Sequence, residues 1–181
     1  MHTNEIGEFG VLGVLAEGAA DLETVHDRLQ HTVGRYWTAG HGVLEPTLDR
    51  LRSAGHVAPV SADGGAETKT AFEITADGRD RLADLLRRPV PADAIVTRQP
   101  QFVLKMGFLH HLPAAEQADQ LAALEDRVEQ ERNRWLDVID RHAAASADPP
   151  GYRRDLQDLT VRLYDTYREW LAGLGAPSQT A

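Results

Sequence analysis

Cysteine is absent from this chain of 181 residues, and its absence excludes several kinds of chemistry. No disulfide, thiolate-bound zinc, iron–sulfur cluster or cysteine nucleophile can form, which is typical of a protein in a reducing compartment. Aromatic residues make up only 6% of the chain, so its core must consist mainly of aliphatic side chains. With 42% hydrophobic and 26% charged residues, the composition is that of an ordinary globular protein.

Positive charge and long apolar runs are also scarce. The chain has 19 Lys and Arg against 28 Asp and Glu, a net charge of −9, and its only lysines are Lys69 and Lys105. Such a protein has no general attraction to nucleic acid or anionic lipid, so any contact with DNA requires a local patch. No segment approaches the roughly 20 apolar residues of a membrane helix, and the first residues do not resemble a signal peptide. We therefore expect a cytoplasmic protein that makes no membrane contact.

The pattern of residues 1–88 predicts a DNA-binding domain of mixed structure. Apolar residues at helical spacing predict three helices, over about 6–17, 22–33 and 42–54, and Asp21 can cap the second of them. Two strand-like segments then flank a Gly-rich turn, and Thr75 can cap a fourth helix. Three helices followed by a two-stranded hairpin are the order of a winged helix-turn-helix domain.

The second half of the chain predicts helices alone. Three prolines mark residues 89–100 as a linker. The segments after it are predicted to be a helical dimerisation domain over residues 101–174 and a disordered tail over residues 175–181. A long helix over 114–145 and a final helix each carry a narrow apolar seam, which one chain cannot fully cover. We therefore predict a homodimer whose interface contains Leu121, Leu124, Val128, Trp135, Leu163 and Trp170. The fold class predicted is mainly α with a small β-hairpin wing.

Four segments together resemble the PadR family of bacterial transcriptional regulators. They are FGVLGVLAEG at 9–18, GVLEPTLDRL at 42–51, FEITADGR at 72–79 and FVLKMGFL at 102–109. The long charged helix and the stretch from Tyr164 to Leu171 extend the likeness over about residues 6–174. The resemblance implies a homodimer that binds a palindromic operator through its winged domain. Many members of that family are repressors, and some respond to small aromatic or phenolic ligands.

The third predicted helix supplies the main candidates for DNA contact. At about 100° per residue, with Leu44 in the core, its outer face carries Val43, Pro46, Asp49, Arg50 and Ser53, with Thr47 on the flank. Arg50 is the best candidate for reading a base, because a guanidinium can donate two parallel hydrogen bonds to guanine. The connector before this helix and the hairpin supply candidates for phosphate contact, namely Arg35, Tyr36, His41, Thr68 and Lys69.

Other kinds of site have weaker support in the sequence. Trp135, Trp170 and Phe102 are candidates to bind an aromatic effector, although they are also ordinary packing residues. His110 and His111 are adjacent, and adjacent helical residues do not share a face, so we predict no metal site and no cofactor. No nucleophile motif, P-loop or dinucleotide-binding motif occurs, so we predict no enzyme.

A protein–protein interaction module without specific DNA binding is the alternative function. Residues 1–88 contain nine Lys and Arg against fourteen Asp and Glu, which is unusual for a DNA-binding domain. Glu45 supports the same alternative, because it places an acid on the helix that would approach phosphate.

Overall fold

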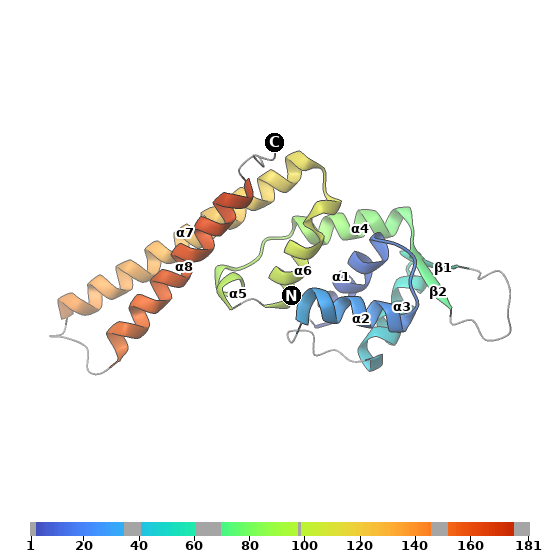
Figure 1. The fold of residues 1–181 in the computed structure, drawn as a ribbon, viewed down its shortest axis with the longest axis horizontal. Coiled ribbons are helices and arrows are strands. Elements are labelled where there is room, and N and C mark those ends of the chain that lie inside the picture. Colours follow the sequence, from blue (N-terminus) through green and yellow to red (C-terminus); the bar gives the residue numbers. More distant parts are fainter. Residues whose placement is uncertain (1–2, 35–40, 61–69, 98, 146–151, 176–181) are drawn as a thin grey trace. The chain divides into compact units, whose positions relative to one another are not determined.

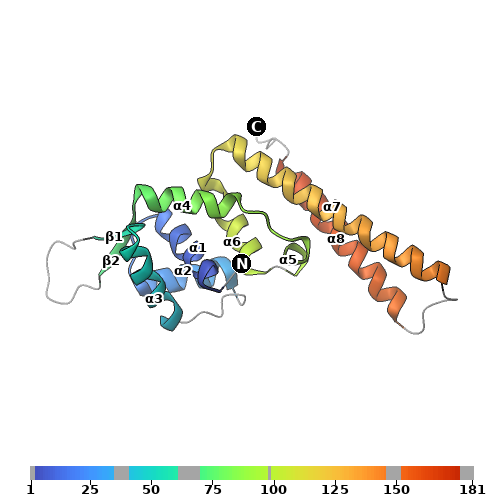
Figure 2. The same cartoon turned by 180° about the vertical axis from the view of Figure 1, so that it is seen from behind.

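The computed structural model describes residues 3–34, 41–60, 70–97, 99–145 and 152–175. The chain divides into two compact units, which are described separately here (Figures 1 and 2). The first unit contains Met1–Arg88 and Arg98–Pro113, and the second contains Pro89–Thr97 and Ala114–Ala181. Among the described residues, no helix is long and apolar enough to cross a membrane.

The first unit is a winged helix-turn-helix domain, as the sequence predicts. Its elements are α1 (Thr3–Ala16), α2 (Leu22–Val33), α3 (His41–Ser53), β1 (Val57–Val60), β2 (Ala71–Ile74), α4 (Ala76–Arg87), α6 (Pro100–Phe108) and the 3₁₀ helix η2 (Leu109–His111). Every residue from Phe9 to Leu15 is buried, so α1 is covered on all sides rather than amphipathic. It contacts α2, α3, α4, α6 and β2 and is the centre of this unit.

Side-chain caps begin two of the helices where the sequence predicts them. The Asp21 carboxylate accepts a hydrogen bond from the Thr24 amide at 2.8 Å, which satisfies a free N–H group in the first turn of α2. Thr75 caps α4 in the same way, accepting from the Gly78 amide at 3.1 Å. The Thr75 hydroxyl also donates to the Gly55 carbonyl at 2.7 Å, which links the end of the α3 segment to the start of α4.

The wing is a short antiparallel hairpin. Val57 pairs with Ile74 at one end of the register and Val60 pairs with Ala71 at the other. Ala20 forms an isolated bridge to Phe72 on the other side of β2, so β1 is at the edge of this small sheet. An edge position suits Pro59, which has no amide hydrogen to donate.

Helix α6 packs with the first unit, whereas the sequence predicted residues 101–113 in the second domain. Phe102, Leu104 and Phe108 are buried, and α6 contacts both α1 and α2. Gly13 on α1 makes this packing possible, because a Cβ atom there would lie 2.3 Å from the Phe108 ring. The apolar pattern of residues 102–109 predicts that this segment is buried, but it does not predict which unit buries it.

The described residues of the second unit form three helices, α5 (Ala92–Val96), α7 (Ala114–Ala145) and α8 (Arg153–Gly175). The predicted linker 89–100 is therefore not simply extended, since α5 forms within it and packs on α7 and α8. Helices α7 and α8 lie side by side (Figure 1), with Leu124, Val128, Tyr164 and Leu171 buried between the helices of this unit. The predicted bounds of α7 are confirmed. Gly175 ends α8, and the other residues of the predicted tail lie outside the described residues.

Candidate nucleic-acid interface

One face of α3 is exposed and presents a mixed set of charges. Leu44, Leu48 and Leu51 bury the opposite face, as the predicted helical spacing requires. The exposed side chains are Glu45, Pro46, Asp49, Arg50, Arg52 and Ser53, while Val43 is half-buried. At about 100° per residue, Arg50 and Val43 lie along one edge of this face, and Glu45, Asp49 and Arg52 lie along the other. The two edges therefore differ in charge.

Arg50 is held against its own helix by two hydrogen bonds. Its Nη2 donates to the Thr47 hydroxyl at 3.1 Å, and its Nε donates to the Pro46 carbonyl at 3.4 Å. Neither bond uses Nη1, so the end of the guanidinium remains available to an external acceptor. A guanidinium fixed in this way loses less rotational freedom when it binds, which favours recognition of a planar acceptor.

Thr47 is buried, whereas the sequence placed it on the flank of the exposed face. Only 1% of the residue is exposed, and its hydroxyl donates to the Val43 carbonyl at 2.8 Å while accepting from Arg50. Gly7 on α1 is the reason, because a Cβ atom at that position would lie 3.3 Å from the Thr47 hydroxyl. Close approach of α1 therefore covers Thr47, and its part in the interface is to hold Arg50.

Five of the predicted contact residues have no described side chain. Arg35, Tyr36, Thr68 and Lys69 lie outside the described residues. His41 is the first residue of α3, and its side chain is likewise not described. For these positions the sequence remains the basis of the prediction.

The acidic edge of α3 borders a cavity of about 450 Å³. Glu45 and Asp49 line it from α3, and Asp21 and Glu23 line it from the start of α2. Its remaining walls are Leu22, Leu48, Thr70 and Phe72. Four carboxylates around one hollow repel phosphate, so this part of the surface opposes rather than supports contact with a duplex.

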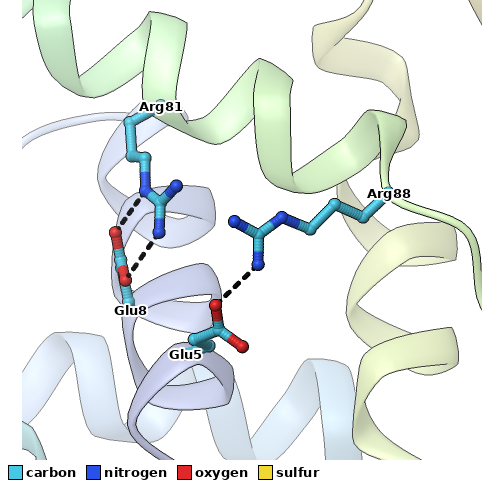
Figure 3. Close-up of polar contacts among 4 residues, drawn as sticks. All are labelled: Glu5, Glu8, Arg81 and Arg88. Carbon is cyan, nitrogen blue, oxygen red and sulfur yellow. Dashed lines mark hydrogen bonds and ion pairs between the residues drawn. The ribbon is translucent and has the colours of Figure 1, made fainter. Parts of the chain in front are cut away.

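Two other arginines of the first unit are engaged in ion pairs between α1 and α4 (Figure 3). Arg81 donates to both carboxylate oxygens of Glu8, at 2.6 and 3.2 Å, and Arg88 donates to Glu5 at 2.6 Å. The hydrogen bond that Arg81 donates to Glu8 raises the pKa of Arg81 above its ordinary value. These cations join two helices of the core, so Arg50 is a better candidate for DNA contact than either.

The predicted effector residues belong to different units. Phe102 is buried in α6 of the first unit. Trp135 is half-buried on α7 and Trp170 is 44% exposed on α8, where its ring packs edge-on against Tyr167 at a centroid distance of 6.3 Å. Phe102 is therefore a core residue of the winged unit, and only the two tryptophans remain candidates for an aromatic ligand.

The predicted dimer residues divide into covered and exposed groups. Leu124 and Val128 are buried within their own unit, and Leu121 and Trp135 are half-buried. The predicted apolar seam of α8 is largely exposed in the single chain, while Tyr164 and Leu171 are buried in the unit. The exposed large apolar side chains along this seam are Leu156, Leu159, Leu163, Trp170 and Leu174.

The chain is similar to known transcriptional regulators. The family model described as "Putative AphA-like transcriptional regulator" matches residues 2–174. The "Negative transcriptional regulator PadR" of Bacillus subtilis (strain 168) is 24% identical over 148 residues, which cover 80% of this chain and 79% of that protein.

The solved structures that the comparison matches to this chain include two of Bacillus subtilis PadR. The complex with operator DNA is 21% identical, covers 93% of this chain and 96% of that chain, and has a TM-score of 0.43. The complex with p-coumaric acid is 20% identical, covers 97% of each chain and has a TM-score of 0.42. The virulence activator AphA of Vibrio cholerae is 18% identical, covers 92% of each chain and has a TM-score of 0.39.

Proposed function

Since this chain belongs to the AphA-like family of transcriptional regulators, we propose that it binds operator DNA as a homodimer and represses transcription. The observation that carries the proposal is the geometry of Arg50. It is an exposed arginine on the helix that follows the turn of the helix-turn-helix, and Thr47 orients it from within the core. An arginine at such a position can reach base edges in the major groove, and the hydrogen bond to Thr47 restrains its orientation. We propose no catalytic activity.

A second copy of the chain is the proposed partner of α8. Leu156, Leu159, Leu163, Trp170 and Leu174 recur at helical spacing and form an apolar stripe of exposed side chains. Exposed stripes of this kind mark interfaces between proteins. Leu124 and Val128 are already covered within the chain, so the proposed dimer surface is centred on Leu163 and Trp170.

Dimerisation also explains how a winged unit with an acidic surface could bind DNA. One winged unit with carboxylates beside its recognition helix has little phosphate affinity of its own. Two winged units on one dimer bind two half-sites together, and the second contact then benefits from a high effective concentration. We therefore propose a palindromic operator.

Repression and a response to an aromatic molecule are proposed from the named relatives. The Bacillus subtilis relative is a negative regulator, and one of its solved structures contains p-coumaric acid. On this chain Trp135 and Trp170 supply flat apolar rings of the kind that stack on aromatic ligands. An aromatic effector bound near these rings would reach the same unit that carries the proposed dimer surface.

The acidic cavity beside α3 favours one alternative, a winged domain that binds a basic segment of another protein. Glu45, Asp49, Asp21 and Glu23 would then attract the partner's cations. Under this alternative the chain would bind no duplex, even at low salt.

Operator selection followed by a salt titration separates the two functions. Genomic fragments enriched by the full-length protein supply the operator, and fluorescence anisotropy then measures its affinity at several salt concentrations. We expect specific binding with a clear salt slope. Absence of duplex binding at low salt would favour the protein-binding alternative.

Two substitutions then assign the contacts. Arg50→Ala is expected to lower operator affinity by about 1–3 kcal/mol and to relax specificity at one base pair. Lys69→Ala should weaken binding to all sequences alike and reduce the salt slope by about one. Arg162→Ala changes an exposed arginine of α8 and is the matched control. Unchanged operator affinity in Arg50→Ala would show that α3 does not read the operator through this residue.

A further inference from the structure

Three side chains with metal-binding atoms meet in the first unit, away from α3. Glu17 directly follows the last residue of α1, and His110 and His111 lie in η2. One ligand atom from each residue lies within 4.8 Å of the other two. Glu17 is far from the two adjacent histidines in the sequence, so only the tertiary fold brings it to them.

Core packing explains why η2 lies beside the end of α1. Gly13 allows the ring of Phe108 to rest directly on α1, and Phe108 is the residue before η2. The ring of Phe108 in turn stacks on His111, with centroids 6.3 Å apart and 29° between the planes. A fully buried aromatic ring therefore positions one of the three candidate ligands before any ion binds, which lowers the entropic cost of binding.

The two histidines lie closer together than regular helical geometry suggests. Their ring centroids are 4.2 Å apart, with the planes inclined at 39°. His110 and His111 end a single 3₁₀ turn, in which adjacent residues still diverge by about 120° around the axis, so side-chain torsions rather than the helix type bring the two rings together. The argument from sequence against a metal site at these residues is therefore wrong in its geometry.

His111 has an unused ligand atom. Its Nε2 is buried and has no hydrogen-bond partner among the described residues. A buried nitrogen without a partner is costly and calls for a specific explanation. Burial, followed by the neighbouring His110, lowers the pKa of His111, while Glu17 opposes that shift and Arg79 adds to it. The neutral imidazole is the form that binds metals.

We propose that Glu17, His110 and His111 bind one divalent transition-metal ion of the Zn²⁺ type, with water at the fourth position. Imidazole nitrogen and carboxylate oxygen are ligands that Zn²⁺, Co²⁺ and Ni²⁺ share. In a tetrahedral zinc site with bonds of about 2.0–2.2 Å, the ligand atoms lie about 3.3–3.6 Å apart. The present atoms, up to 4.8 Å apart, would close by rotation of Glu17 and His110, which are both exposed.

The ion would join two segments that are far apart along the chain, the end of α1 and η2. It would link the end of α1 to η2, immediately before Pro113 and the start of α7. Binding to the folded state alone stabilises that state by mass action, so the metal should raise the unfolding temperature of the first unit.

Calorimetric titration of Zn²⁺ into the untagged, chelator-treated full-length protein tests the proposal, with Co²⁺ absorption as a second measurement. We expect one ion per chain and a rise in Tm. Glu17→Gln and His110→Ala alter exposed side chains, so both variants should fold, as circular dichroism can verify. Each should weaken binding by at least about tenfold, since even outer-shell changes at metal sites have effects of this size.

His31→Ala is the matched control, because His31 is exposed on α2 and its ring contacts only the Asp27 carbonyl among the described hydrogen bonds. It should bind the metal as the parent does. The proposal is overturned if no binding is detected up to about 1 mM Zn²⁺. It is equally overturned if either Glu17→Gln or His110→Ala binds as tightly as the parent, because the ion would then lie elsewhere or lack one of the three ligands.

Discussion

Thr47 and Arg50 lie one turn apart on α3, and the buried hydroxyl of the first accepts a hydrogen bond at 3.1 Å from Nη2 of the second. A residue that never reaches the surface thus restrains the residue proposed to read DNA. Thr47→Val keeps the shape of the side chain but removes the acceptor. We expect Thr47→Val to bind the operator more weakly than the parent does. The loss of affinity should be smaller than in Arg50→Ala, because the guanidinium remains but is no longer oriented.

Fluorescence anisotropy on the selected operator measures this effect, and thermal unfolding measures the accompanying loss of the hydroxyl bond to Val43, about 1 kcal/mol. When Arg50 is already alanine, Thr47→Val should have no additional effect on operator affinity. Equal losses in both backgrounds would mean that Thr47 acts through stability alone.

Leu163→Glu is predicted to separate the proposed dimer into folded monomers. Leu163 is 39% exposed in the single chain, so a carboxylate there is tolerated by the monomer but opposes an apolar interface. Light scattering coupled to size exclusion gives the molar mass, and circular dichroism checks the fold. Ala122→Glu adds the same charge at an exposed position of α7 and should leave the dimer intact. A parent protein that is monomeric at micromolar concentration would contradict both the dimer and the palindromic operator.

Glu8→Gln should destabilise the first unit much more than loss of a surface ion pair. The Glu8 and Arg81 side chains are 17% and 27% exposed, and two hydrogen bonds join them (Figure 3). We expect a loss of about 1–3 kcal/mol in the free energy of unfolding, as for hydrogen bonds between charged groups. Asp49→Asn is the comparison, because the Asp49–Arg52 side chains are 63% and 54% exposed. That pair should contribute about 0–1 kcal/mol. Chemical denaturation measures both, and equal losses would refute the assignment.

Gly13→Ala is predicted to destabilise the protein although alanine favours a helix. Alanine would gain at most about 1 kcal/mol in helix propensity. The added Cβ would lie 2.3 Å from the buried Phe108 ring, and overpacking of this kind costs about 1–3 kcal/mol. A net loss is therefore expected in thermal unfolding.

The second change Phe108→Leu should make Gly13→Ala less harmful, because it shortens the side chain that the new Cβ would meet. Gly173→Ala on α8 is the control, since a Cβ there meets no atom within 4 Å and should be neutral or stabilising. If Gly13→Ala behaved like Gly173→Ala, the close approach of α1 and Phe108 would be incorrect.

Tyr164 should make the second unit sensitive to alkaline pH. Burial, followed by the charge of Glu131, raises the pKa of Tyr164 above its usual value of about 10. The folded state then holds the phenolic proton more tightly than the unfolded chain does. Its contribution to stability is complete below about pH 10 and is lost as the pH rises from there through the folded pKa. Tyr164→Phe should lose less stability than the parent between pH 8 and pH 11 in chemical denaturation. Tyr152→Phe, at an exposed position, should behave as the parent does.

Local sequence was sufficient to predict most of the secondary structure. Asp21 and Thr75 cap the helices they were expected to cap, because capping depends on an amide only three residues away. The long helix α7 has the predicted bounds, since apolar periodicity and flanking prolines act within a few turns. The order of these elements was also sufficient to indicate the winged helix-turn-helix, and the family comparison agrees with that prediction.

Contacts between distant segments were decided by the tertiary structure. The sequence did not show that α6 belongs to the winged unit or that Thr47 is buried under Gly7. Nor did it show that Glu17 meets His110 and His111. Periodicity identifies a side chain as apolar or polar and places it on a face, but it does not identify the surface that covers this face. That choice depends on close packing over the whole unit, where the absence of one Cβ atom at Gly13 allows Phe108 to approach and so determines which residues become neighbours.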